Sequence, residues 1–353
     1  MQILLIVLFV IFVLIGVPIS YALGFVSFAG IAALPIIPNS VVFTKMFNGL
    51  NSFTLLAVPL FILAANLMNE GSISDRLIDV CKSSVGHVRG GLAHANILVS
   101  MIFAGISGSS QADTAGIGKI LIPAMEKQGY DKGTAVGVTA ASSTLGSIIL
   151  IGGIVSGLFT PTESAAVACV YALIIGIFFY HTIKISRIPA ILIETMKLSS
   201  LSLFALAAAN ALGELMSYYQ LNEKVQGIFV GMPGGKLVFL IVVVLFFMFV
   251  GTFMDAVPAM ILFVPIILPS ATALGVSPII LGLIVVVTLA LGLVTPPYGL
   301  CLLLAGSISG ISIEDSFKGV LPYFLSSIAV LALMIVFSDV FLAIPTALFP
   351  NLF

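Results

Sequence analysis

The chain has very little charge and no tryptophan. Only 8% of its 353 residues are charged, and the net charge is −1, whereas about 25% of residues are charged in a typical soluble domain. The first charged residue is Lys45, and 58 residues without any Asp, Glu, Lys or Arg separate Asp255 from Glu314. Because about 20 apolar residues cross a bilayer core of about 30 Å, the sequence predicts a multi-pass protein embedded in a lipid bilayer.

Other scarcities exclude whole classes of function. The three cysteines are scattered without a CxxC pair, which argues against a disulfide framework or a zinc site. The near-zero charge provides no basic surface for nucleic acid. An ATP-driven pump would carry the phosphate-binding sequence GxxxxGK[ST], which is absent here, and the three histidines have no matching Ser or Cys nucleophile motif. We therefore expect neither an ATPase nor an enzyme.

Prolines interrupt the long uncharged stretch. Simple spanning helices do not tolerate so many, but broken helices occur at membrane depth where their backbone lines a cavity. Transporters place substrate and ion sites at such breaks, whereas a channel would need an open pore lining. The prolines in question are Pro258, Pro265, Pro269, Pro278, Pro296 and Pro297.

The sequence also repeats itself at a spacing of 146 residues. Matches at glycine and proline matter most, because these two residues constrain backbone geometry. A looser echo pairs residues 63–66 with 206–210. Duplicated transporter halves commonly meet at a site near the midplane, so we expect two related halves. The matching pairs are Gly105 and Gly251, Pro123 and Pro269, Gly129 and Gly275, Leu145 and Leu291, and Gly146 and Gly292.

Each copy predicts a re-entrant hairpin followed by a broken helix. The hairpin tips are residues 105–114 (GISGSSQADT) and 251–258 (GTFMDAVP). Carbonyl and hydroxyl oxygens at such tips suit a hard cation such as sodium, and the N-termini of half-helices suit a substrate carboxylate. Three open alternatives are that the serines only let helices approach closely, that Asp255 only reaches the membrane interface, and that residues 295–299 form an ordinary kink.

Three motifs resemble those of a known family. Residues 105–125 (GISGSSQADTAGIGKILIPAM), 251–269 and 293–300 (LVTPPYGL) strongly resemble the large membrane subunit of tripartite ATP-independent periplasmic (TRAP) transporters. Residues 90–103 (GGLAHANILVSMIF) and 159–166 (FTPTESAA) support the resemblance, which covers nearly the whole chain.

The resemblance implies a sodium-coupled importer of organic acids, of the C4-dicarboxylate or sialic acid class, in the bacterial inner membrane. It also implies a small membrane (Q) subunit, a periplasmic binding (P) protein and an elevator movement in an all-α fold. We expect substrate contacts from Ser107, Ser109, Ser110 and Asp255. The expected sodium ligands are Gly105, Ser107, Gly108, Thr144, Gly146, Gly251, Asp255, Thr295, Pro296 and Gly299.

One departure from the family concerns the first copy. In the family, the sequence TLGSII is followed by a Pro-Pro-Ser break, another helix and an amphipathic arm, whereas here residues 144–149 run directly into Leu150. The repeat indicates the same, because Ile149 matches Thr295 and only the second copy continues with two prolines. A block is therefore expected to be missing after Ile149, which predicts either an asymmetric protein with one good sodium site or a gap between Ile149 and Leu150.

This organisation predicts five segments. They are scaffold helices at 1–104, a first hairpin and broken helix at 105–149, scaffold helices at 150–250, a second hairpin and broken helix at 251–310, and a C-terminal helix and tail at 311–353. Among other polar residues, Glu163 predicts a helix-capping box, and His94 and Asn96 predict hydrogen bonds between helices. Two alternatives remain for function: an inactive or scaffold-only shortened subunit, and an organic-anion transporter of the same fold that works without a binding protein.

Overall fold

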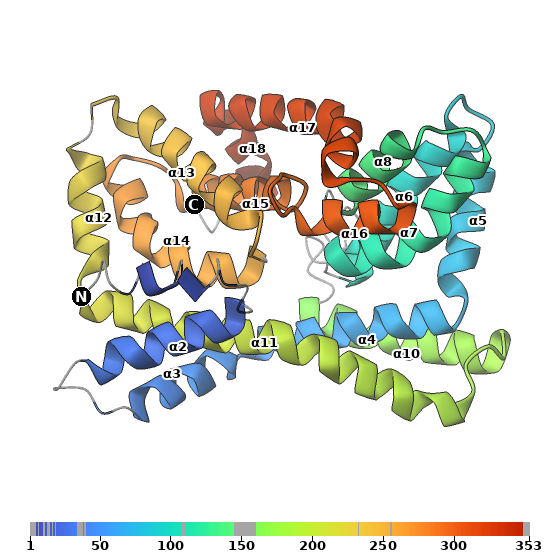
Figure 1. Ribbon diagram of the computed structural model, residues 1–353, viewed down its shortest axis with the longest axis horizontal. Coiled ribbons are helices and arrows are strands. Elements are labelled where there is room, and N and C mark those ends of the chain that lie inside the picture. The colour runs from blue at the N-terminus through green and yellow to red at the C-terminus, as the bar shows by residue number, and fades with distance from the viewer. Residues whose placement is uncertain are drawn as a thin grey trace. The chain divides into compact units, whose positions relative to one another are not determined.

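A computed structural model of the chain describes residues 5, 7–9, 11–12, 15, 17, 19–33, 38, 40–107, 110–144, 160–231, 233–254 and 256–348. Every regular element in this part of the chain is a helix (Figure 1), as the sequence predicts. Three helical stretches are long and apolar enough to cross a membrane, and several shorter apolar helices accompany them. The three stretches are Ile185–Tyr218, Ala256–Ala273 and Ile313–Val336.

The chain divides into two compact units. Unit 1 comprises Met1–Ser52, Ser200–Leu289 and Val330–Phe353, and unit 2 comprises Phe53–Ser199 and Ala290–Ala329. Unit 1 contains α2 (Ile19–Ala32), α3 (Ser40–Leu50), α12 (Leu221–Val230), α13 (Gly235–Gly251), α14 (Ala256–Ala273) and α18 (Ser338–Leu348).

Unit 2 contains the first copy of the repeat and part of the second. Its helices include α4 (Ala57–Glu70), α5 (Ile73–Val85), α6 (Gly91–Ser107), α7 (Ser110–Lys127), α8 (Lys132–Thr144), α10 (Pro161–Ile174) and α16 (Leu300–Ser309). A π-helical turn, Ile175–Phe179, and a 3-10 turn, Ile185–Arg187, follow α10. Three helices pass from one unit to the other: α11 (Ile188–Tyr218), α15 (Pro278–Gly292) and α17 (Ile313–Val336).

The helix boundaries repeat at the spacing seen in the sequence. Both α7 and α8 begin 146 residues before α14 and α15, respectively. The turn after each hairpin contains a glycine with positive φ, Gly129 at +88° and Gly275 at +70°, a conformation that favours glycine. The shared spacing of helix ends and turn glycines shows that the copies share local architecture as well as sequence.

The structure changes the register of the weaker echo. The bend between α4 and α5 contains Ser72 at φ 52°, and the bend between α11 and α12 contains Gln220 at φ 53°. These bends lie 148 residues apart, so Asn66 corresponds to Glu214, whereas the echo aligned it with Asn210. The two alignments differ by one helical turn, and a short sequence match within a helix cannot distinguish alignments that differ by one turn.

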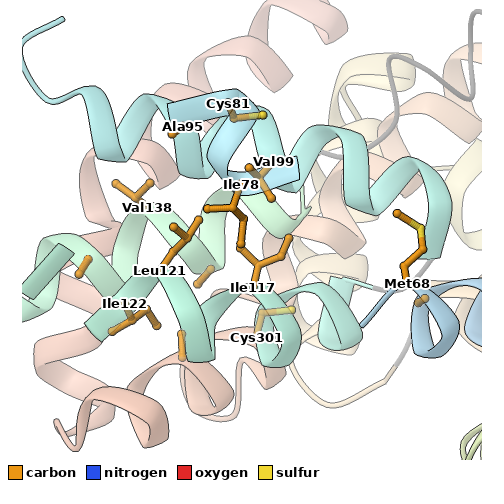
Figure 2. Packing of buried hydrophobic residues seen from close by; sticks show 14 of the residues in the cluster. Met68, Ile78, Cys81, Ala95, Val99, Ile117, Leu121, Ile122, Val138 and Cys301 are labelled. Carbon is orange, nitrogen blue, oxygen red and sulfur yellow. The ribbon is translucent and has the colours of Figure 1, made fainter. Parts of the chain in front are cut away.

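The core of unit 2 is a cluster of small and branched apolar side chains. Figure 2 shows Ile78 and Val99 facing Ile117 and Leu121 of the hairpin arm α7, with Cys301 from α16 beside them. Helix α4 packs along α10 (Figure 1), and the capping box expected at Glu163 is confirmed at the start of α10. The first hairpin and α8 thus rest on a well-packed base.

Candidate functional site

The ends of the two repeat-equivalent helices, α8 and α15, meet at one cavity in unit 2. The cavity has a volume of about 50 Å³, which is enough for a few water molecules. Ala141 and Thr144 from the last turn of α8 and Leu291 from the last turn of α15 line it, together with Val294 beyond α15. A helix C-terminus carries a partial negative charge, so two such ends at one cavity favour a cation there.

The segment between α15 and α16 is a tight, non-helical break. The Thr295 hydroxyl donates to the Leu291 carbonyl at 2.6 Å, which fastens the break to the last turn of α15. The Leu293 carbonyl accepts from the Cys301 N–H at 3.0 Å and so holds the start of α16. Gly299, at φ 52°, lies against the Thr295 backbone, where a Cβ would be 2.9 Å from the Thr295 carbonyl oxygen. Glycine is therefore required at position 299.

The break leaves carbonyl oxygens without backbone donors. Within the described part of the chain, no backbone N–H donates to the carbonyls of Thr295, Pro296, Pro297 or Tyr298. Thr295 and Pro296 are half-buried, while Pro297 and Tyr298 are exposed. Half-buried carbonyls without donors are the ligands with which transporter breaks bind sodium. The described residues contain no cluster of His, Cys, Asp or Glu that could hold a metal ion, so ligation here would come from neutral oxygens.

The first hairpin places polar residues at the start of α7. Ser110 is the first residue of α7 and is half-buried, while Asp113 and Thr114 are fully buried. The Thr114 hydroxyl donates to the Ser110 carbonyl at 2.8 Å. Lys119, in contrast, is exposed. A helix N-terminus favours anions, and the first turn of α7 already holds the buried side chain of Asp113.

A buried hydrogen-bond network joins α8 to the first hairpin. The Asn96 amide of α6 donates to the Thr139 hydroxyl of α8 at 2.7 Å, and the Ser142 hydroxyl donates to that of Ser100 at 2.9 Å. The interhelical hydrogen bond predicted at Asn96 is thereby confirmed, whereas the His94 ring contacts the Gly90 carbonyl just before the start of its own helix. At the positions 146 residues further on, the second copy has Val242, which is half-buried, and Val285, which is fully buried. The network thus positions α8 in a way that the second copy does not use.

The predicted site residues fall into three groups. Thr144 and residues 295–299 belong to unit 2. Thr144 lines the cavity, as does Val294 just before the predicted ligands, whereas residues 295–299 are not among the lining residues. Gly251 is buried at the end of α13 in unit 1, so its pairing with the break stays a prediction. Gly105 lies in the last turns of α6, and Ser107 ends that helix. Gly108, Ser109, Gly146 and Asp255 lie outside the described residues, as does the junction of Ile149 and Leu150.

Sequence reasoning did not include α17 in the site. Val320, Tyr323, Phe324, Ser326 and Ser327 line the same cavity as α8 and α15. This helix lies beyond both repeat motifs, and its apolar sequence resembles any spanning helix. Only the tertiary contact identifies it.

Comparison with known proteins identifies the family. The family model described as the DctM component of tripartite ATP-independent periplasmic transporters matches residues 6–149 and 147–340. The chain is 32% identical to the uncharacterized protein YgiK of Salmonella typhimurium, with 97% of each chain covered. It is 29% identical to the sialic acid TRAP transporter large permease SiaM of Vibrio cholerae, covering 94% of this chain and 95% of that protein. It is also 29% identical to the C4-dicarboxylate large permease DctM of Pseudomonas aeruginosa, covering 85% and 88%.

These matches also bear on the expected missing block. The family match comes in two stretches that meet at residues 147–149. The alignment with YgiK runs over 423 positions, 70 more than the 353 residues of this chain, so at least 70 positions fall opposite a gap in this chain. The break in the match falls where the two copies of the repeat diverge. Through a match that extends from residue 6 to residue 340, the chain belongs to the DctM family, the large membrane component of tripartite ATP-independent periplasmic transporters.

Proposed function

We propose that the chain carries out sodium-coupled uptake of an organic acid across the bacterial inner membrane. The observation that supports this most directly is the shared cavity at the C-terminal ends of α8 and α15, beside a break whose carbonyls lack backbone donors. Sodium entering with its gradient would supply the driving force. No nucleotide-binding sequence offers another source of energy.

Sodium would be held by the oxygens of Thr295, Pro296 and Gly299 in the break and by Thr144, which lines the neighbouring cavity. The ligands expected from the repeat at Gly251 and Asp255, and at Gly105, Ser107, Gly108 and Gly146, stay predictions. The substrate carboxylate would bind at the start of α7, near Ser107, Ser109 and Ser110, where the helix N-terminus favours an anion. The division into sodium ligands at helix C-termini and substrate ligands at a helix N-terminus follows from the direction of the helix dipole.

The substrate class follows the relatives named as sialic acid and C4-dicarboxylate permeases. Two other relatives are named for isethionate and for 2,3-diketo-L-gulonate. A small membrane subunit and a periplasmic binding protein would work with the chain, and an elevator movement would carry the site across the membrane. Some relatives are longer proteins, and one of them, named DctMQ, has only 63% of its length covered by the match. That excess length is consistent with an additional membrane component fused to the large one.

Uptake into proteoliposomes tests the proposal. The purified chain is reconstituted with its small subunit, and accumulation of radiolabelled sialic acid and of succinate is measured with an inward sodium gradient, with and without the periplasmic binding protein. We expect accumulation of one acid that requires both sodium and the binding protein. Equal uptake in choline chloride would refute sodium coupling, and full uptake without the binding protein would identify a transporter that works alone.

A second candidate function is a shortened subunit that inserts but does not transport. The absence of at least 70 aligned positions favours it, since the missing block follows α8 in the first copy. In the same assay this candidate predicts normal insertion and association with the small subunit, but no accumulation of any acid under any gradient.

A further inference from the structure

Helix α8 is buried along most of its length, and α17 covers one of its sides. Gly133 and Gly137 of α8 lie directly against Gly319 of α17, and a Cβ added to Gly137 or to Gly319 would overlap the backbone of the opposite helix. One turn further along α8, Ala141 lines a cavity together with residues of α17. Small residues at this spacing let two helix backbones approach closely in a membrane. Residues 135–143 of α8 are all buried.

Helix α15 is the counterpart of α8 in the second copy, but one of its faces is open. Ile279 and Leu283 stand 146 residues after the two glycines of α8, and they are 37% and 36% exposed. Val286 beside them is 47% exposed, and among the described residues nothing lies within 4 Å of the place where a Cβ of Gly282 would stand. These four residues form what we call the open face of α15. The residues of the opposite face are buried: Ile280, Leu281, Ile284, Val285, Thr288 and Leu289.

The repeat indicates what would cover the open face. In a fold built from two related copies, contacts between the copies are expected in equivalent pairs. Helix α17 follows the broken helix of the second copy and covers α8 of the first, so a first-copy counterpart of α17 would cover α15. The chain has no room for it, because only residues 150–160 separate Ile149 from the start of α10 at Pro161. In the second copy, α16 and α17 span residues 300–336, and the positions that fall opposite a gap in this chain, at least 70 of them, are enough for both helices.

The open face defines the chemistry of its partner. It contains no charged or polar side chain, which suits an apolar helix within the bilayer. Ile279 and Leu283 are bulky where α8 has glycines, so a closely packed partner must present small residues opposite them and a larger side chain opposite Gly282. A second copy of this chain offers only its own α17 for this role, and Gly319 of that helix already lies against α8. The partner is therefore a different polypeptide.

We propose that the open face of α15 is a docking site for a transmembrane helix of a separate polypeptide, which carries the counterparts of α16 and α17 that this chain lacks. The chain is then one of two polypeptides that together form a large membrane subunit. Docking covers α15 of the second copy in the same way as α17 covers α8 of the first. This inference does not depend on sodium coupling or on the identity of the substrate.

Photo-crosslinking in membranes tests the docking. The amino acid p-benzoylphenylalanine, which reacts with neighbouring C–H groups on illumination, replaces Leu283 in the full chain. The probe is the segment of YgiK that falls opposite the gap in this chain, produced as a separate tagged polypeptide. We expect illumination to join the chain to the segment, and to do so far less when the same amino acid replaces Val167, which is exposed on α10. Adding Gly282→Leu should lower the yield roughly 5-fold or more, because overpacking weakens a close contact by such a factor.

A second arm of the experiment covers the case in which the separate segment does not accumulate in membranes. There the segment is inserted between Ile149 and Leu150 with a protease site at each end, so that cleavage releases it unless it is crosslinked. Ile279 serves as a second position for the crosslinking amino acid. A product of twice the mass of the chain would assign the open face to a second copy, and an unchanged mass in both arms would show that lipid covers it. Either result, or an equal yield from Val167, would overturn the proposal.

Discussion

Replacing Gly319 with alanine should destabilise the protein, although alanine is the better helix former. Alanine gains about 0.8–1.0 kcal/mol over glycine in the interior of a helix. At Gly319, however, the added Cβ would overlap the Gly133 carbonyl, and a backbone group cannot move aside as a flexible side chain can. Overpacking of this kind costs typically 1–3 kcal/mol and occasionally more, so the clash should outweigh the gain in helix propensity.

Gly282→Ala is the matched control. Gly282 lies inside α15, and no atom is within 4 Å of the place where its Cβ would stand. There the gain in propensity is unopposed, so the control should be as stable as wild type or more stable. Glycine-to-alanine substitution is therefore expected to lower the free energy of unfolding at Gly319 and to leave it unchanged or raise it at Gly282.

Thermal unfolding of the detergent-solubilised protein measures the difference. A change of 1 kcal/mol shifts the melting temperature by about 2–4 °C in domains of 150–250 residues, so Gly319→Ala should melt several degrees below Gly282→Ala. A Gly319→Ala protein as stable as Gly282→Ala would refute the close contact and the placement of α17 that depends on it.

Four further predictions follow from the site and from α10. Thr295→Val should raise the sodium concentration for half-maximal uptake without weakening substrate binding at saturating sodium, and an unchanged sodium curve would remove Thr295 from the site. Asp255→Asn should nearly abolish transport while the protein still inserts; normal uptake would make Asp255 an interfacial residue only. Because of the block missing after Ile149, sodium activation should follow a Hill coefficient near 1, and a coefficient near 2 would contradict a single good site. Hydrogen bonds from the Thr160 backbone and hydroxyl lower the pKa of Glu163 below its ordinary value of 4.5, so its stabilising effect is complete above that value and is lost as the pH falls through the lower folded-state pKa. The melting temperatures of wild type and Glu163→Gln should therefore differ at pH 7 and converge in acid, and a constant difference would contradict the capping role.

Much of the fold could be predicted from the sequence because the relevant signals are local. Scarcity of charge and long apolar runs predict membrane helices whatever their packing. Gly129 and Gly275, at a 146-residue spacing, mark the turns after α7 and α14, since a positive φ favours glycine. The matched Pro123 and Pro269 lie inside those helices, and α14 continues through Pro265 and Pro269, so the expectation that these prolines break the helix was wrong. The capping box at Glu163 depends on residues three apart, and short spacings of this kind need no tertiary information.

The weaker echo shows where this kind of inference fails. Small apolar residues recur along any membrane helix, so a match such as that between Asn66 and Asn210 can slip by a turn. The bends at Ser72 and Gln220 correct it, but neither residue is glycine, and nothing in the local sequence marks a left-handed conformation there. The sodium ligands proposed from the two hairpins and breaks stay predictions for a related reason, because ligation depends on atoms that are distant in sequence.

By itself, the sequence determined that the chain belongs to the DctM family, that it is rich in long apolar runs, and that glycines and prolines recur in it at a 146-residue spacing. Only the tertiary structure decided that α8, α15 and α17 meet at one cavity, and that Gly133 and Gly137 lie against Gly319. The physical reason is the separation between the partners. The apolar length of a helix and the breaks in it can be predicted from residues a few positions apart in the sequence. The neighbour of a helix is determined by complementary shape with residues more than 100 positions away in the sequence. In a membrane, both faces of a helix can be apolar, so the sequence pattern does not show which face packs against another helix.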